Sequence, residues 1–408
     1  MRRGWRLSVL PGILLLPLLA GRAAGAGWDF TAPGDPARNW NVSASTDGTY
    51  DDNFFSTKNG REAGFRSATD IRLHANIPLE RLFVGGQYDF GIVYPHDTKL
   101  GGVEENHSAS VSANYTVNPL LTLSLSGSFI SSLEPGLVLT ANNVPVTIAS
   151  AGSYIYDSVN GGVNYALSPR WTVAASGGWD VWEYQNATQA TNNNHQDYSG
   201  TISALYALDA RTTIGINYQY AQDVFDFAGL NNGLNGYANT GYLSATRRFN
   251  PRLSLTVNGG YTIRNSQDGS QNTSPSGGGT LVYNYNIDSS ILLTVAQSLS
   301  EASVGVTRNF SAQENTSLAL QINHRLTAKL RARGDVTYVY SSFTAPLTPT
   351  VTLKPNEQAV TSHFGLSYAF REWLSANADY YHTDLSSSSP LIEVYTRNQV
   401  SVGITLTY

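Results

Sequence analysis

The chain of 408 residues contains no cysteine and one methionine, and only 13% of its residues are charged. The absence of cysteine excludes disulfide bonds and thiolate metal sites. Soluble proteins carry about 25% charged residues, so this chain is poor in the Lys and Glu that normally solvate a polar surface. After position 26, no apolar run approaches the roughly 18 residues of a spanning helix, which excludes a helical membrane protein.

The first 26 residues have the three parts of a signal peptide. Three arginines precede an apolar segment (7–20), and the small residues Ala-Gly-Ala (24–26) follow it. The apolar segment contains two prolines and is too short to cross about 30 Å of hydrocarbon as a helix, which argues against a membrane anchor. We therefore predict cleavage after residue 26, a short periplasmic lead over 27–39, and a single barrel domain over 40–408.

Cleavage would make the chain more acidic. Four of the 25 Lys and Arg lie in the signal segment, which leaves 21 against 30 Asp and Glu, a net charge of −9. Such a balance argues against nucleic acid as a partner.

Segments of about ten residues alternate between apolar and polar along the whole chain. The segment LSLTVNGGYTIR (253–264) shows this pattern, as do 122–129 and 212–220. Because strand side chains point alternately to two faces, each segment predicts a strand with one apolar and one polar face. Short turns recur about every 40 residues. We place them at 76–81, 117–120, 167–170, 207–211, 248–252, 286–290, 323–327 and 369–372, with longer polar connections between them and one shorter connection near 311–315.

This count predicts about 18 antiparallel strands, with 16 as the alternative. The polar faces are mostly Ser, Thr, Asn, Gln and Gly, whereas a soluble sandwich or solenoid would place Lys and Glu there. Tyrosines gather at the margins of the apolar faces, as at a membrane–water boundary. Lipid forbids open sheet edges. The fold class is therefore all-β: a transmembrane antiparallel β-barrel with short periplasmic turns and longer extracellular loops, in the outer membrane of a Gram-negative bacterium.

The final segment, NQVSVGITLTY (398–408), alternates strictly and ends on an aromatic residue. This pattern is typical of the assembly signal of outer-membrane barrels, which the barrel assembly machinery would bind as an added strand. The residues predicted to form the signal are Val400, Val402, Ile404, Leu406 and Tyr408.

Two segments carry a resemblance to a known family. GTYDDNFF (48–55), with Tyr50, Asp51, Asp52 and Asn53, and LSYAFREWLSANADY (366–380) resemble the β-barrel porin type 2 family of Gram-negative outer membranes. The resemblance implies a porin-like protein, and it links some members to export of extracellular polysaccharide.

A barrel of 18 strands is wide enough for a water-filled lumen. Parity places seven side chains on the lumen side: Arg72, His74, Arg264, Lys329, Arg331, Arg333 and Asp335. One interpretation is a basic stripe that selects anionic solutes or orients an acidic polysaccharide. The other is that these cations pair with Asp and Glu on neighbouring strands.

Three further features have two interpretations each. The apolar loop 132–152 either constricts the mouth or forms a short hairpin packed on its neighbours. The acidic group Asp47, Asp51 and Asp52 either binds cations that bridge lipopolysaccharide or is a solvated loop cluster. A last group of three aromatics is either a sugar-stacking platform or part of the boundary belt: Trp179, Trp182 and Tyr184.

No enzyme, metal site or cofactor is predicted. The seven histidines occur singly, without the spacing of a triad or metal cluster, and the Gly-rich segments precede no helix. We predict passive passage of small hydrophilic solutes, with an accessory barrel for polysaccharide export or attachment, its lumen plugged, as the alternative. A loop-driven adhesin is a third class. The expected partners are outer-membrane lipid and lipopolysaccharide, the assembly machinery, and a small solute or polysaccharide; the oligomeric state is not predicted.

Overall fold

The computed structural model describes the barrel and its short turns. The described residues are 39–96, 102–132, 137–139, 145–147, 153–185, 194–225, 235–267, 269–300, 310–346, 355–388 and 394–408. The predicted signal peptide and nearly all of the lead lie outside these residues. Among the described residues, no helix has the length and apolar character needed to cross a membrane.

The described residues form twenty strands. They are β1 (Trp40–Asp51), β2 (Gly64–Pro78), β3 (Leu82–Pro95), β4 (Glu104–Asn118), β5 (Leu121–Ser132), β6 (Leu137–Leu139), β7 (Pro145–Thr147), β8 (Tyr154–Ala166), β9 (Trp171–Tyr184), β10 (His195–Asp209), β11 (Thr212–Phe225), β12 (Gly236–Asn250), β13 (Leu253–Ser266), β14 (Gln271–Asn286), β15 (Ser289–Ser300), β16 (Phe310–Arg325), β17 (Leu330–Pro346), β18 (Asn356–Arg371), β19 (Leu374–Ser387) and β20 (Tyr395–Thr407).

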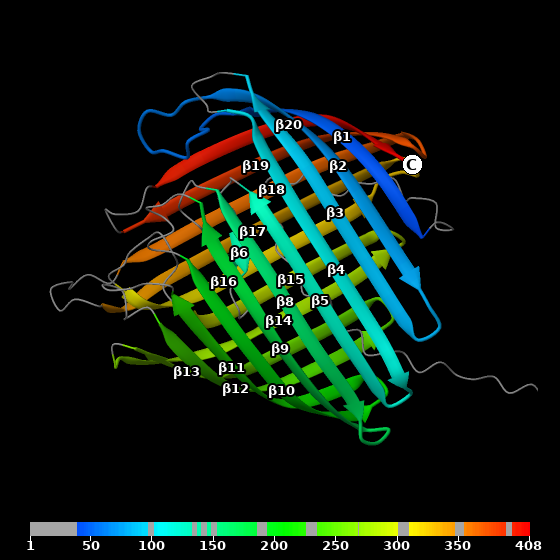
Figure 1. Cartoon of the computed structure of the whole chain (residues 1–408), viewed down its shortest axis with the longest axis vertical. Helices are drawn as coiled ribbons and strands as arrows, with labels where there is room; N and C mark the ends of the chain where they lie inside the picture. Colours follow the sequence, from blue (N-terminus) through cyan, green and yellow to red (C-terminus); the bar gives the residue numbers. More distant parts are fainter. Residues whose placement is uncertain are drawn as a thin grey trace, which may run out of the picture.

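Eighteen of these strands form one closed antiparallel sheet, and β6 and β7 form a separate two-stranded hairpin. Closure occurs where β1 pairs with β20, in a register that runs from Ser43 opposite Thr407 to Asp51 opposite Gln399. Figure 1 shows neighbouring strands side by side, with the strands of opposite sides of the barrel crossing in the view and the C-terminus at the end where the short turns lie. The predicted fold class and the predicted number of strands are confirmed.

The two faces of the sheet differ as the alternation predicts. Ile216, Leu243 and Val402 expose 61–69% of their surface on the outer face. Their strand neighbours Asn217 and Ser401 lie on the other face and are buried. A continuous apolar exterior of this kind suits hydrocarbon, and closure leaves no unpaired strand edge.

Several short turns share one local design, in which an Asn or Asp ends the strand beside a register shift. At Asn250, for example, the ladder to β13 shifts, and the Asn250 Oδ1 accepts the backbone N–H groups of Arg252 at 2.8 Å and Leu253 at 2.9 Å. Asn118 and Asp209 accept backbone N–H groups in the same way. The side chain therefore satisfies donors that the turn would otherwise leave unpaired.

Candidate functional site: the inner wall and the seam

The inner face of the barrel is polar on every side but divided in chemistry. From β4 to β15 it carries mainly Ser, Thr, Asn and Gly, for example Ser126, Asn160 and Thr240. From β16 round to β3, across the closure, it carries most of the charged side chains. We call these two surfaces the neutral wall and the charged wall.

Close packing on the neutral wall requires glycine at one position in particular. A Cβ at Gly260 would lie 2.1 Å from the Gly241 carbonyl oxygen and 2.5 Å from the Tyr242 Cβ. Distances this short exclude any side chain at residue 260, so the β12–β13 pairing depends on a glycine there.

On the charged wall, Arg72 of β2 meets Asp89 of β3. The Arg72 Nε lies 2.5 Å from the Asp89 Oδ1, and Gln87 and Ser108 donate to the other carboxylate oxygen at 2.6 and 3.2 Å. His74 is half-buried two residues further along β2, opposite Asn41 of β1 and Gln87 of β3. The arginine is thus held in a hydrogen-bonded pair with its neighbour strand.

A second network on this wall centres on His363 of β18. Its Nδ1 lies 3.1 Å from the Asp335 Oδ1 and its Nε2 lies 2.9 Å from the Asp379 Oδ1. Asn377 donates to Asp379 at 2.9 Å, and the imidazole stacks on Tyr381 with 4.5 Å between ring centroids. A histidine can donate to two carboxylates at once only from a doubly protonated ring, so this arrangement suits an imidazolium. The network crosses β17, β18 and β19 and fixes their inner faces together.

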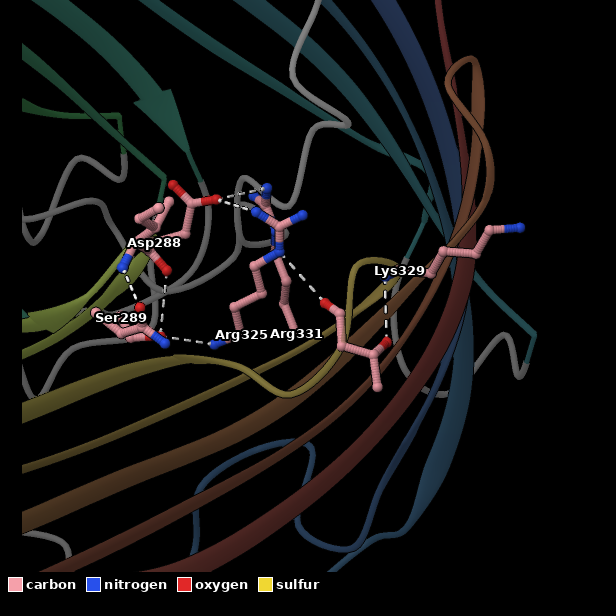
Figure 2. A network of polar contacts seen from close by, with 8 residues as sticks. Asp288, Ser289, Arg325, Lys329 and Arg331 are labelled. Atoms are coloured by element: carbon pink, nitrogen blue, oxygen red, sulfur yellow. Dashed lines mark hydrogen bonds and ion pairs between the residues drawn. The ribbon is translucent and has the colours of Figure 1, made fainter.

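A basic group lies on the charged wall close to the short turns (Figure 2). The Asp288 carboxylate accepts from Arg325 at 3.0 Å and lies 3.5 Å from the Arg331 guanidinium. Arg333, one step further along β17, lies 3.7 Å from Asp335. The side chains of Arg325 and Arg331 are each more than a third exposed, so these pairs are weak and solvated.

Lys329 differs from the other residues predicted to face the lumen. It lies in the turn before β17, and its Nζ donates to the Phe370 carbonyl at 3.4 Å. Figure 2 shows it extending away from Asp288, Arg325 and Arg331. The predicted parity of Lys329 assumed that β17 begins earlier than Leu330.

Arg264 is the most buried of the predicted residues. Its guanidinium pairs with Asp223 across the intervening strand β12, and both side chains are only 2–3% exposed. The second interpretation, pairing with carboxylates of neighbouring strands, describes Arg72, whereas Arg264 pairs with a carboxylate two strands away. Arg331 and Arg333 also pair with carboxylates, but with Asp288 of a turn and Asp335 of their own strand. Whether these residues line a pore is taken up below as a proposal.

The motif that carried the family resemblance lies at the seam. Asp51 is fully buried, and its Oδ2 accepts from the Nε of Arg397 at 2.8 Å, from a second nitrogen of the same guanidinium, and from Gln399 at 2.8 Å. Asp52 accepts the backbone N–H and the side-chain amide of Asn398, both at 2.6 Å. These contacts join the loop ends of β1 and β20.

Asn53 extends this seam network into the following loop. Its side-chain amide donates to the carbonyls of Thr57 and Thr396 at 2.8 and 2.9 Å, and its Oδ1 accepts from the backbone of Thr57. The interpretation of the acidic group as a solvated loop cluster is wrong for Asp51, because its carboxylate is enclosed by donors of β20. Sequence reasoning missed Arg397, although it is the single Lys or Arg on the last strand.

The three aromatics near the end of β9 do not act as one group. Trp179 is exposed on the outer face, whereas Trp182 and Tyr184 are buried on the inner one. The split follows from parity, because an odd and an even position on a strand cannot share a face. Inside, Trp182 stacks on His195 and His195 stacks on Phe225, with ring centroids 6.0 and 4.9 Å apart.

A second buried cluster at the loop end was not predicted. It contains Phe310, Val339, Phe343, Ala359 and Leu385, with Tyr395 packed against it. Loop 132–152 contains the hairpin β6–β7, which one interpretation predicted, whereas the predicted packing on its neighbours and the alternative constriction of the mouth stay predictions. The side chains of this hairpin lie outside the described residues.

The predicted assembly segment forms β20 and the residue that follows it. Val400, Val402, Ile404, Leu406 and Tyr408 are all exposed on the outer face. The backbone N–H of Tyr408 donates to the Val42 carbonyl at 2.8 Å, and the backbone N–H of Val42 donates to the Tyr408 carbonyl at 3.1 Å. The centroid of the Tyr408 ring lies 6.0 Å from that of the Trp40 ring. The role of this segment in assembly stays a prediction.

Comparison with known proteins supports the same class. Residues 235–408, which span β12 to β20, match the model of the family described as "Putative beta-barrel porin 2". The resemblance seen in the sequence is therefore confirmed over this part of the chain. Together with the closed sheet and its apolar exterior, the match makes the protein an outer-membrane β-barrel of Gram-negative bacteria. It is porin-like.

Solved structures resemble the chain only distantly. OccK2 (OpdF) of Pseudomonas aeruginosa is 10% identical, with 90% of this chain and 98% of that chain covered and a TM-score of 0.47. OccK1 (OpdK) of the same organism is 10% identical, with 91% and 99% covered and a TM-score of 0.47. The siderophore receptor PirA, also of Pseudomonas aeruginosa, is 12% identical, with 92% and 81% covered and a TM-score of 0.43. No curated protein matches the sequence.

Proposed function

We propose that the barrel is a passive pore for small hydrophilic solutes. The observation that carries this proposal is the polar inner face on every strand of a closed 18-stranded sheet. A barrel of this strand number has room for an aqueous lumen, and polar walls hydrate a solute in transit.

The pore-lining residues would be Arg72, His74, Arg331, Arg333 and Asp335. Arg264 lies on the same face but is only 1% exposed, and Lys329 extends away from the basic group (Figure 2), so neither would contact a solute. Most of the arginines have carboxylate partners, so the wall would present paired charges rather than a bare cationic stripe. We therefore expect weak ion selectivity, with solutes chosen mainly by size and hydration.

Planar-bilayer recording of the purified mature protein tests this proposal. Discrete current steps that scale with salt concentration are expected for a water-filled pore. A correctly folded barrel that gives no steps, while a known porin gives them in the same bilayers, would contradict it.

Charge reversal at Arg331 and Arg333 tests whether the charged wall influences the ion selectivity of the pore. Their side chains are 37% and 19% exposed, so both charges reach solvent in the interior. Arg331→Glu/Arg333→Glu should shift the reversal potential toward cation preference under a salt gradient. The matched control Lys58→Glu/Arg61→Glu makes the same change in net charge on the loop after β1 and should leave the reversal potential nearly unchanged.

A second candidate is an accessory barrel for polysaccharide export or attachment with a plugged lumen. It is favoured by the complete burial of side chains at the loop end, including Asn315 and Phe343. Binding of an acidic polysaccharide without bilayer conductance would support this candidate. Deletion of 133–152 should then open the barrel and produce current steps.

A further inference from the structure

Positive and negative side chains are unevenly distributed along the barrel: the described residues near the short turns are mainly basic, and the others are mainly acidic. We define the short-turn rim as the eight short turns plus four strand residues on each side of each turn. It contains eleven Lys and Arg: Arg81, Arg170, Arg211, Arg247, Arg248, Arg252, Arg325, Lys329, Arg331, Arg333 and Arg371. It contains four carboxylates: Glu80, Asp209, Asp288 and Glu372.

The rest of the described chain has the opposite balance, with 6 Lys and Arg against 18 Asp and Glu. A strongly acidic protein thus has one cationic edge. Part of this edge, Arg325, Arg331 and Arg333, faces the interior and pairs with Asp288 and Asp335. These interior pairs do not explain why the other eight cations lie on the short-turn rim.

Several of them lie beside aromatic side chains of the outer face. Arg247 is on the outer parity of β12, and its guanidinium lies 5.5 Å from the centre of the exposed Phe249 ring. Arg211 reaches the same residue, with its Nη1 3.4 Å from the Phe249 carbonyl. Arg170 donates to the Tyr206 hydroxyl at 3.4 Å, beside the Trp171–Tyr206 ring pair. Three guanidinium groups therefore lie along the short-turn margin of adjacent strands β9 to β12, and those of Arg170 and Arg247 lie beside aromatic rings of the outer face.

Their depth in the membrane is set by the aromatic rings. Trp, Tyr and Phe at a barrel margin lie at the level of the lipid headgroups. Short turns of outer-membrane barrels face the periplasm, so this margin meets the periplasmic leaflet, which is built of glycerophospholipids. A guanidinium presents two parallel N–H donors to a phosphate and is more weakly hydrated than an ammonium. One carboxylate, Asp209, belongs to the group, and its Oδ1 is occupied by the backbone N–H of Arg211 at 2.6 Å.

We propose that Arg170, Arg211 and Arg247 form a binding site for an anionic phospholipid on the outside of the barrel. The headgroup phosphate would lie between Arg211 and Arg247 beside Phe249, and Arg170 would extend the site toward Trp171. Lys329 lies in another turn, where its ammonium donates to the Phe370 backbone carbonyl at 3.4 Å, and it is not part of this site. This proposal is independent of whether the lumen conducts.

The test uses the mature barrel in nanodiscs of phosphatidylglycerol and phosphatidylethanolamine in equal amounts. Native mass spectrometry after release counts the lipids that stay bound. Phosphatidylglycerol should be enriched over phosphatidylethanolamine on the wild type. Arg211→Gln/Arg247→Gln should reduce the enrichment by about fivefold per cation removed, the effect expected for a basic side chain at an anionic membrane surface.

Two further variants keep the test decisive. Lys58→Gln/Arg61→Gln removes the same charge on the loop after β1 and should preserve the enrichment. Arg211→Lys/Arg247→Lys keeps the charge but loses the paired guanidinium donors, so its enrichment should fall between those of the wild type and the Gln variant. Equal retention of both lipids by the wild type would overturn the proposal. So would an equal loss in the loop control, because the effect would then come from the net charge of the protein and not from these arginines.

Discussion

At the scale of single residues, the best-defined feature is the seam network around Asp51. The carboxylate is fully buried and accepts three hydrogen bonds from Arg397 and Gln399 of β20. The Tyr-Asp-Asp-Asn motif can be found in the sequence, but its role cannot, because the β20 partners of Asp51 and Asp52 lie 346 or more residues away. Local alternation identifies a strand and its faces; it does not say which polar side chains meet once the sheet closes.

Removal of Arg397 should strongly destabilise the barrel. Arg397→Gln leaves the Asp51 charge buried without its main partner, for which we expect a loss of about 3–5 kcal/mol in the free energy of unfolding. Urea unfolding in lipid vesicles, followed by tryptophan fluorescence, measures it. Asp51→Asn/Arg397→Gln should recover part of the loss. A single variant within about 0.5 kcal/mol of the wild type, the range of surface substitutions, would show that the pair adds little.

A second residue-scale prediction concerns the turn cap at Asn250. Asn250→Ala removes an acceptor for two backbone N–H groups and should cost about 1 kcal/mol, the usual net value of such a bond. The same unfolding measurement applies, with Asn258→Ala, at an exposed asparagine of the neighbouring strand β13, as comparison. If the two variants unfold at the same urea concentration, the cap has no stabilising role.

At the scale of elements, the alternation of apolar and polar residues predicted the strands, their two faces and most of the turns. The prediction from alternation was wrong at residues 311–315. These residues were predicted as a short connection, but they lie inside β16. Ser, Gln, Glu and Asn suggested a loop there, but at the loop end of a barrel the inner face is polar and the strand continues. The eighteen barrel strands are 12 to 17 residues long, more than the roughly 9–11 that span hydrocarbon.

The outer face of β20 should tolerate charge poorly. Val402→Arg places a cation near the middle of the membrane, where we expect a cost of about 2–4 kcal/mol. Thr405→Arg, on the inner parity of the same strand, is the matched control and should cost much less. Folding titrations into phospholipid vesicles measure both. A similar cost for the two variants would mean that β20 does not have one lipid face and one water face.

At the scale of the whole molecule, composition predicted more than any motif. Few charges, many tyrosines and no long apolar run indicated a closed membrane sheet before any residue was assigned a role. The same composition could not show that positive charge gathers at the short-turn end, since that pattern exists only once the turns are brought to one edge. Nor could it place the buried aromatic and apolar clusters at the opposite end, which are each assembled from three or more strands.

The pairing of β1 with β20 also sets an order of events during biogenesis. Until the last strand is in place, the growing sheet has two unpaired edges, and hydrocarbon offers no partner for either. Contacts that join positions more than 340 residues apart can form only when nearly the whole polypeptide is present. A chain released before β20 should therefore wait outside the bilayer, exposed to proteases, instead of inserting as a smaller cylinder.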